Sequence, residues 1–224
     1  MTERVSAASQ AAFDRERNEA RRTVAPDAGS VRAQVVRMYS RLEHEQKAVI
    51  DSEKLALACE RGCSYCCHQR VEVRPYEVFL LAEHVRTRLS ASQQTDLKRR
   101  LAVNLARISS LEPLQHTRAG VGCAMLQDGA CSVYEARPAA CRKYYSLSVE
   151  TCRNAFEHPA EPLSGPLEDN ALRLAGNAVA LGYGRGVEES GRDASRYELH
   201  TALLEALENP KASKRYRDGK KAFV

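Results

Sequence analysis

The hydrophobic pattern along the chain predicts a mostly helical protein. From Val31 to Cys59 apolar residues recur at helical spacing, which predicts one long helix or two, ended by Gly62. Pro75 suits the first position of the next helix, because proline lacks the amide hydrogen that this position leaves unused. Ser90 and Gln93 have the spacing of a capping box and predict the start of a further helix. The first half of the chain is therefore expected to be helical around one irregular segment.

The middle of the chain predicts loops and one short helix. Proline and glycine make residues 111–122 a loop, and Asp128-Gly129 is a turn signal. Arg137-Pro138 is expected to open a short helix that carries Cys141. The segment around Cys152 has no clear periodicity. We expect little regular structure in this region.

The last third predicts a linker followed by two amphipathic helices, at about 167–181 and 195–207. The linker is marked by Pro159, Pro162, Gly165 and Pro166. Three glycines are expected to separate the helices, at Gly182, Gly184 and Gly186.

These elements predict a single, mostly α-helical domain with irregular cysteine-rich loops around a metal site. The domain is expected at residues 30–208, with its motif core at 59–152. The polar residues 1–29 predict a mobile N-terminal arm. The basic residues 209–224 predict a loose C-terminal tail.

Composition narrows the classes of function. Hydrophobic residues make up 43% of the 224 residues and charged residues 28%, as in globular domains, and the net charge is +5. Tryptophan is absent, only 6% of residues are aromatic, and basic residues are not interleaved with aromatics, so a nucleic-acid surface is not favoured. The cations near cysteines would instead offset the negative charge of thiolates: Arg61, Arg70, Arg137, Arg142, Lys143 and Arg153.

The sequence predicts a cytoplasmic protein with no membrane partner. Its first residues are polar and charged, without the apolar stretch of roughly 7–15 residues of a secretory leader. No apolar run approaches the roughly 18 residues that a membrane span needs. In that reducing compartment clustered cysteines indicate metal binding more than disulfides or a redox-active thiol pair.

Cysteines are the clearest chemical signal. Four lie within nine residues, and the eight candidate metal ligands are Cys59, Cys63, Cys66, Cys67, Cys123, Cys131, Cys141 and Cys152. Thiolates are soft ligands that select zinc, copper(I) or iron–sulfur clusters. The two-residue gap between Cys63 and Cys66 lets both sulfurs reach one metal, and a distant second group would complete the shell.

The adjacent Cys66 and Cys67 leave the number of metals open. Neighbouring side chains diverge, so either the two bind different metals or only one is a ligand. Eight cysteines permit two four-sulfur sites, one iron–sulfur cluster with spare thiols, or a two-metal cluster. The spacing does not match the ferredoxin patterns closely.

Other residues near the cysteines are expected to support the site. His68 is a candidate ligand, but we favour a supporting or exposed histidine, and more strongly so for His116. Arg137 is expected to pair with Glu135 or with the negative charge of the cluster. Four tyrosines are expected to wall the site: Tyr65, Tyr134, Tyr144 and Tyr145.

The motif Cys-x3-Cys-x2-Cys-Cys-His, together with the block from Cys131 to Arg142, resembles the YkgJ-type cysteine-cluster proteins. This is a family of zinc- or iron-chelating domains named for a CxxCxxCC motif. The resemblance spans Cys59 to Cys152 and implies that all eight cysteines are family positions. It also covers the signature residues Tyr134, Arg137, Pro138 and Arg142. The first gap here is three residues instead of two, which makes Cys59 the weakest match.

Two functions are compatible with these features. We favour a protein that binds zinc or iron without catalysis of its own and holds the metal for its fold or for a protein partner. The alternative is an iron–sulfur or zinc-dependent enzyme, redox or protein-modifying. Some relatives are associated with flagellin lysine methylation, but this chain has no glycine-rich loop of the dinucleotide type. Cysteine-rich ligand sets suit closed or cluster sites better than an open catalytic zinc.

Overall fold

The computed structural model describes residues 2–24, 28–161 and 165–224. Within these ranges the chain is 65% helical, with ten α-helices and only small strands. The prediction of a mostly helical fold is confirmed. Within the described ranges, none of the helices is both long enough and apolar enough to cross a membrane.

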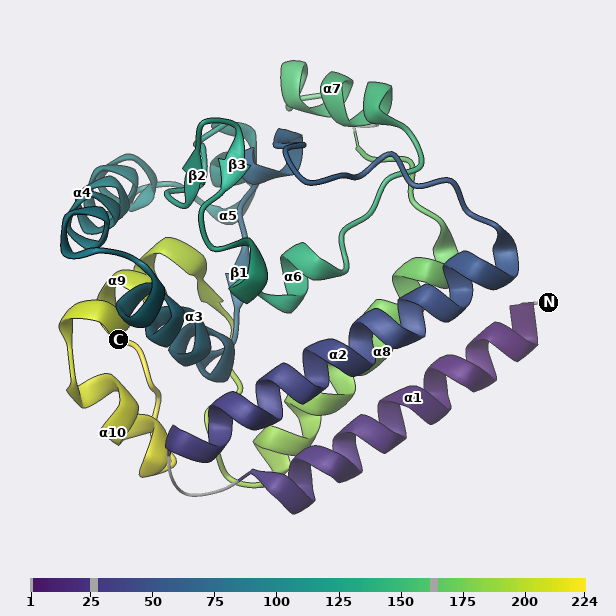
Figure 1. Cartoon of the computed structure of the whole chain (residues 1–224), viewed down its shortest axis with the longest axis horizontal. Helices are drawn as coiled ribbons and strands as arrows, with labels where there is room; N and C mark the ends of the chain where they lie inside the picture. Colours follow the sequence, from purple (N-terminus) through teal and green to yellow (C-terminus); the bar gives the residue numbers. More distant parts are fainter. Residues whose placement is uncertain (1, 25–27, 162–164) are drawn as a thin grey trace.

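Three long helices lie side by side along one flank of the molecule (Figure 1). They are α1 (Thr2–Thr23), α2 (Ala28–Glu53) and α8 (Asn170–Glu189). Helix α8 packs along both α1 and α2, so the flank joins the beginning of the chain to its last quarter.

Shorter elements form the other half of the molecule. The helices are α3 (Pro75–Arg88), α4 (Ala91–Ile108), α5 (Pro113–Arg118), α6 (Ala139–Arg142), α7 (Val149–Glu157), α9 (Leu199–Glu208) and α10 (Lys211–Arg217), with the 3₁₀ helices η1 (Tyr65–His68) and η2 (Tyr134–Ala136). Helix α9 packs on α3 and α4, and α7 packs on η1.

Two short antiparallel strand pairs tie distant segments together. Strand β1 (Glu72–Val73) pairs with β4 (Tyr197–Glu198), so Glu72 lies opposite Glu198. Strands β2 (Leu126–Gln127) and β3 (Ala130–Cys131) form a hairpin. The predicted turn at Asp128-Gly129 is confirmed, since both residues have positive φ, 48° and 76°.

Two predicted helix starts are also confirmed. Pro75 is the first residue of α3, directly after the segment that contains β1. Ser90 caps α4, and Gln93 returns its side chain to the Ser90 amide, which is the predicted capping box.

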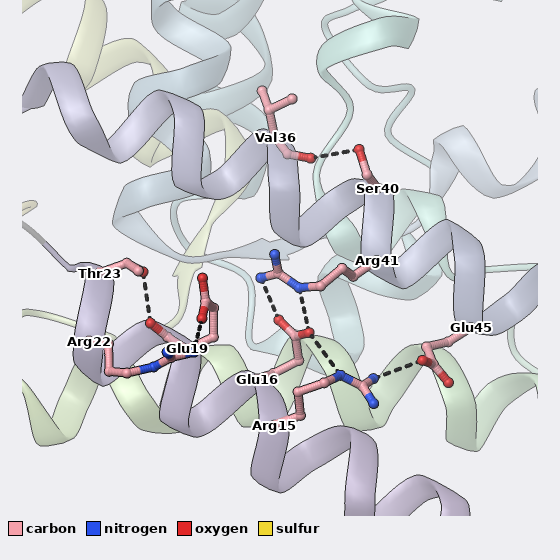
Figure 2. A network of polar contacts seen from close by, with 9 residues as sticks. All are labelled: Arg15, Glu16, Glu19, Arg22, Thr23, Val36, Ser40, Arg41 and Glu45. Carbon is pink, nitrogen blue, oxygen red and sulfur yellow. Dashed lines mark hydrogen bonds and ion pairs between the residues drawn. The ribbon is translucent and has the colours of Figure 1, made fainter.

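The N-terminal segment differs from the mobile arm that the sequence predicted. Residues 2–23 form α1, which buries Ala12 and Ala20 against α8. Figure 2 shows the contact with α2: Nε and Nη2 of Arg41 donate to the fully buried carboxylate of Glu16, at 2.6 and 2.7 Å. A paired and hydrogen-bonded charge can be buried at low cost, whereas an unpaired one cannot.

Helix α8 does not break at Gly182, Gly184 or Gly186, contrary to the prediction. A Cβ at Gly182 would overlap the carbonyl oxygen of Phe13, and one at Gly186 would overlap that of Arg17, both in α1. A Cβ at Gly184 would meet the Arg74 guanidinium. These glycines therefore allow a close approach of two helix backbones instead of ending a helix.

Three further boundaries differ from the prediction. Helix α2 ends at Glu53, where Lys54 takes a positive φ of 52°, so it stops before Cys59. The predicted loop 111–122 contains the short helix α5. Cys152 lies on α7, whose Ser148 cap accepts a hydrogen bond from the amide of Thr151. The expected linker includes Pro162, which lies outside the described residues.

The C-terminal segment is also packed, although the sequence predicted a loose tail. Helix α10 places Tyr216 against Phe79, and Phe223 packs on Phe79 and Tyr197. Tyr216 and Phe223 are 3% and 2% exposed. Asp193 accepts a hydrogen bond from the amide of Ala222 at 2.7 Å. Most basic residues of the segment are exposed, whereas Arg215 pairs with Glu205 and helps the aromatic residues to anchor it.

Candidate metal centre

The eight cysteines come from irregular segments and short helices in the half of the molecule opposite α1. Cys59 and Cys63 lie between α2 and η1, and Cys66 and Cys67 lie on η1. The others lie before β2, on β3, on α6 and on α7: Cys123, Cys131, Cys141 and Cys152. All eight are free and partly buried.

Backbone hydrogen bonds bring the cysteine segments together. The amide of Cys123 donates to the carbonyl of Cys67 at 2.7 Å, which joins the first cluster to the segment before β2. The amide of Ser146 donates to the sulfur of Cys59 at 3.2 Å, and the amide of Ala58 donates to the carbonyl of Ser146 at 2.9 Å. These contacts place the first cluster between the two later cysteine segments.

One group of sulfurs gathers around Cys66. Burial raises the pKa of Cys123 to about 11 and also raises the pKa of Cys131 and of Cys141, and the charges of neighbouring thiols add to each effect. The pKa of Cys66 is raised by its hydrogen bond with Cys67 and then by burial. These mutual effects require that the five sulfurs be near neighbours.

The remaining cysteines adjoin this group on one side. Burial raises the pKa of Cys59, and the charges of Cys152, Cys66 and Cys63 add to it. The packing of α7 on η1 brings Cys152 to this side. The structure thus gathers all eight predicted ligands around η1.

The sulfurs are more widely spaced than in a closed metal shell. Four thiolates on one zinc ion lie roughly 3.8 Å apart, given zinc–sulfur bonds of ~2.3 Å. Within the described ranges, the one group of three or more metal-binding side chains whose ligand atoms all lie within 4.8 Å is a different one: His116, Glu198 and His200. The free, partly buried thiols fit zinc or iron by donor chemistry, and binding would require the sulfurs to draw together.

Arg137 supplies a positive charge beside the sulfurs. Its guanidinium stacks on the ring of Tyr134 at 3.8 Å, and its Nε is buried without a hydrogen-bond partner. Burial raises the pKa of Cys131 and Cys141, and the charge of Arg137 acts in the opposite direction on both. The sequence predicted that Arg137 pairs with Glu135 or with the negative charge of the cysteines. This arrangement favours pairing with the cysteines.

Helix α6, which carries Cys141, is held by a buried carboxylate that the sequence analysis missed. Glu77 is 5% exposed and accepts hydrogen bonds from the amides of Ala139 at 2.7 Å and Arg74 at 3.0 Å, and from the Tyr39 hydroxyl at 3.2 Å. Arg142 stacks on Tyr39 at 4.3 Å. The first turn of α6 is thereby fixed to α2 and α3.

Comparison with known proteins gives a family for this region. Residues 58–159 match the family CxxCxxCC, described as a putative zinc- or iron-chelating domain. We call this matched segment the CxxCxxCC domain, after the family model that it matches. The match contains all eight cysteines, Arg137 and α6. No curated protein and no solved structure matches the chain.

Two histidines of the CxxCxxCC domain, His68 and His116, are packed against other parts of the chain. The His68 ring lies 4.6 Å from that of Phe156, and its Nδ1 lies 3.2 Å from the carbonyl oxygen of Ser64. His116 is 4% exposed. Tyr65 also contacts Phe156, at 5.9 Å, and burial raises the pKa of Tyr144 to about 12. These contacts suit the predicted supporting roles.

The group His116, Glu198 and His200 ties the CxxCxxCC domain to α9. The amide of Ala124 donates to His200 Nε2 at 3.1 Å, and His200 Nδ1 lies 3.1 Å from Glu198. Glu198 also caps α9 by accepting from the amide of Thr201 at 2.8 Å. His200 Nε2 is occupied by the Ala124 amide, whereas Nδ1 is buried beside Glu198 without a hydrogen-bond partner, so the group joins the two segments through Nε2. The sequence shows no spacing signal for it.

Proposed function

We propose that the CxxCxxCC domain binds zinc or iron through cysteine thiolates and performs no catalytic step of its own. The observation that carries this proposal is the gathering of eight free thiols around η1 from segments far apart in the chain. Four separate segments of the chain meet at one place, as the segments that supply ligands to one metal site or cluster must. The description of the family supports a metal without choosing between zinc and iron.

The sulfurs around Cys66 are the best candidates for ligands. These are Cys66, Cys67, Cys123, Cys131 and Cys141. Cys59, Cys63 and Cys152 would complete a second site or a cluster. Because burial raises several of these thiol pKa values, a metal must displace protons when it binds.

A second candidate is an iron–sulfur or zinc-dependent enzyme. The observation that favours it is a cavity of about 560 Å³ whose walls include Cys66 and Cys141. A metal held there would be reachable by a small molecule. A bound metal would supply Lewis-acid or electron-transfer chemistry, and the cavity would orient the partner.

The test is elemental analysis of the full chain purified anaerobically under reducing conditions. We expect at least one zinc or iron per chain, and two or more if Cys66 and Cys67 serve different metals. Acid-labile sulfide with absorption near roughly 400 nm would favour the iron–sulfur alternative. Protein that neither retains metal nor takes it up after reconstitution would overturn the proposal.

We also propose a reducing compartment, the cytoplasm, for this protein. Free thiols at all eight positions support this, because oxidising compartments convert neighbouring cysteines to disulfides. Fractionation of cells that express the full chain would test it. Recovery outside the cytoplasmic fraction would contradict it.

A further inference from the structure

The cavity beside the cysteines has the dimensions of a small-molecule site. Its volume is about 560 Å³, and it lies between η1, β1, α2, α6 and α8. Ligand pockets commonly measure roughly 300–1,000 Å³. Apolar residues from three helices and one loop supply part of the wall: Met38, Val71, Ala140, Ala180 and Leu181.

The charged part of the wall is mainly positive. It holds four cations, Arg70, Arg74, Lys143 and Arg196, and two acids, Glu72 and Glu77. If all six are ionised, the wall carries a net charge of +2, from four positive and two negative groups. An anion with two negative charges would balance it.

Glu72 and Glu77 do not occupy all the hydrogen-bond donors of the arginines in the wall, so donors remain for such an anion. The oxygens of Glu77 are already occupied by two backbone amides and the Tyr39 hydroxyl. Glu72 is shared between Arg70, at 2.7 Å, and Arg196, at 3.5 Å. Each guanidinium has five N–H donors, so one shared carboxylate cannot satisfy both.

Two of the cations can reach into the cavity without disturbing the fold. The side chain of Arg196 is 56% exposed and that of Arg70 is 20% exposed. Lys143 lies deeper and donates to Asn177 of α8. Arg74 donates to the carbonyl of Ala194, so part of its guanidinium is committed to the backbone.

We propose that this cavity binds a small organic phosphate monoester, with the phosphate against Arg70, Arg196 and Lys143 and the organic part toward Leu181 and Met38. A phosphate monoester carries a charge near −2 at neutral pH, and guanidinium groups bind its oxygens in pairs. The apolar wall accounts for the organic part. This binding does not depend on a metal at the cysteines, although Cys66 and Cys141 would face the bound molecule.

The test is calorimetric titration of the purified full chain with inorganic phosphate and with phenyl phosphate. We expect both to bind, phenyl phosphate more tightly. Arg70→Gln/Arg196→Gln should weaken phosphate binding by roughly tenfold or more, because charge-assisted hydrogen bonds are lost. The matched control is Arg107→Gln/Arg118→Gln, which removes two charges at exposed positions of α4 and α5 outside the cavity and should bind like the parent.

Several results would overturn the proposal. If the Arg70→Gln/Arg196→Gln double variant and the control bind phosphate equally, phosphate affinity depends on the net charge of the protein and not on this cavity. Acetate binding as tightly as phosphate would contradict selection of a dianion. Loss of binding on removing metal with a chelator, with the arginines intact, would place the anion on the metal. If the double variant fails to fold by circular dichroism, Arg196→Gln alone must still weaken binding, because its exposed side chain carries little of the fold.

Discussion

Cys141 shows how single residues position the candidate metal centre. It lies on the four-residue helix α6, whose first turn donates to Glu77 and whose last residue, Arg142, stacks on Tyr39. Its helix is thus held from two sides, whereas Cys59, Cys63 and Cys123 lie in segments without helix or strand. A metal would be expected to draw the loop sulfurs toward Cys141 and not the reverse.

We therefore predict that Cys141→Ser lowers the metal content and the melting temperature of the metal-loaded protein. The physical reason is that the best-anchored ligand is lost from the shell. Elemental analysis and thermal melting by circular dichroism measure both effects. As the control, a chelator removes the metal from both the parent and Cys141→Ser. Their melting temperatures should then nearly coincide. Unchanged metal content in the variant would rule out Cys141 as a ligand.

A second prediction concerns the positive charge of Arg137 beside the thiols. Arg137→Met keeps the side-chain stem on Tyr134 but removes the charge beside the thiols. We expect metal affinity to fall by about tenfold, as is typical when a group supporting the ligands is removed. Competition with a chromogenic chelator measures it. Arg61→Met is the matched control, because Arg61 is exposed and lies farther from the same ring, at 5.6 Å. An equal loss in both variants would contradict a specific role.

Glu198 predicts a pH dependence of stability. Burial acts to raise its pKa, but contact with His200 and backbone hydrogen bonds outweigh burial and lower the pKa to about 2, from an ordinary value of 4.5. Because the pKa of Glu198 is lower in the folded than in the unfolded state, its ionised carboxylate stabilises the folded state above about pH 4.5. This stabilisation is lost as the pH falls toward 2. The contribution is on the order of 3 kcal/mol in the free energy of unfolding.

Urea unfolding of the parent and of Glu198→Gln between pH 7 and pH 2.5 tests this. The parent should lose stability over that range more steeply than the variant, and the difference between them should shrink toward pH 2.5. A constant difference across the range would show that the Glu198 charge is not the cause.

Among the elements, α8 shows most clearly where the sequence is informative and where it is not. Pro75, the Ser90–Gln93 pair and Asp128-Gly129 were predicted correctly because their signals are local. The continuity of α8 could not be predicted, because the reason for its glycines is the backbone of Phe13 and Arg17, far away in the chain. The packed terminal segments were missed for the same reason.

We predict that Gly182→Ala separates α1 from α8. The added methyl would overlap the Phe13 carbonyl, and backbone cannot move aside as a flexible side chain can. Overpacking of this kind costs about 1–3 kcal/mol. Hydrogen exchange should then become faster in residues 7–23.

The matched control is Gly165→Ala, because a Cβ at Gly165 would meet nothing within 4 Å. Equal protection of α1 in the two variants would mean that the close helix contact does not hold α1 in place.

In the whole molecule, the CxxCxxCC domain depends on segments outside its matched range. Glu43 pairs with Arg142, Tyr39 donates to Glu77, and β4 completes the pair with β1. The sequence identified the cysteines as candidate ligands because their clustering is visible in one dimension. It could not identify Glu77, Glu198 or His200, because ordinary acids and histidines gain a role only through neighbours that folding brings together.

We predict that a fragment of residues 58–159 is less helical and binds metal more weakly than the full chain. Without α2, α8 and α9 its buried residues lose their partners, among them Tyr76, Val85 and Leu101. Circular dichroism and elemental analysis after reconstitution measure both properties. A fragment with the full chain's metal content and a cooperative melting transition would show that the flanking helices are dispensable.

The pairing of β1 with β4 has a consequence for biosynthesis. Glu72 finds its partner only after the ribosome has made Glu198. At translation rates of about 5–20 residues per second, roughly 2–10 seconds pass between the synthesis of Cys152 and that of β4. All eight thiols precede β4 in the chain, so the nascent chain exposes them to small thiols, oxidants and free metal ions before β1 finds its partner. Loading of the proposed metal would therefore depend on which of these the thiols meet first.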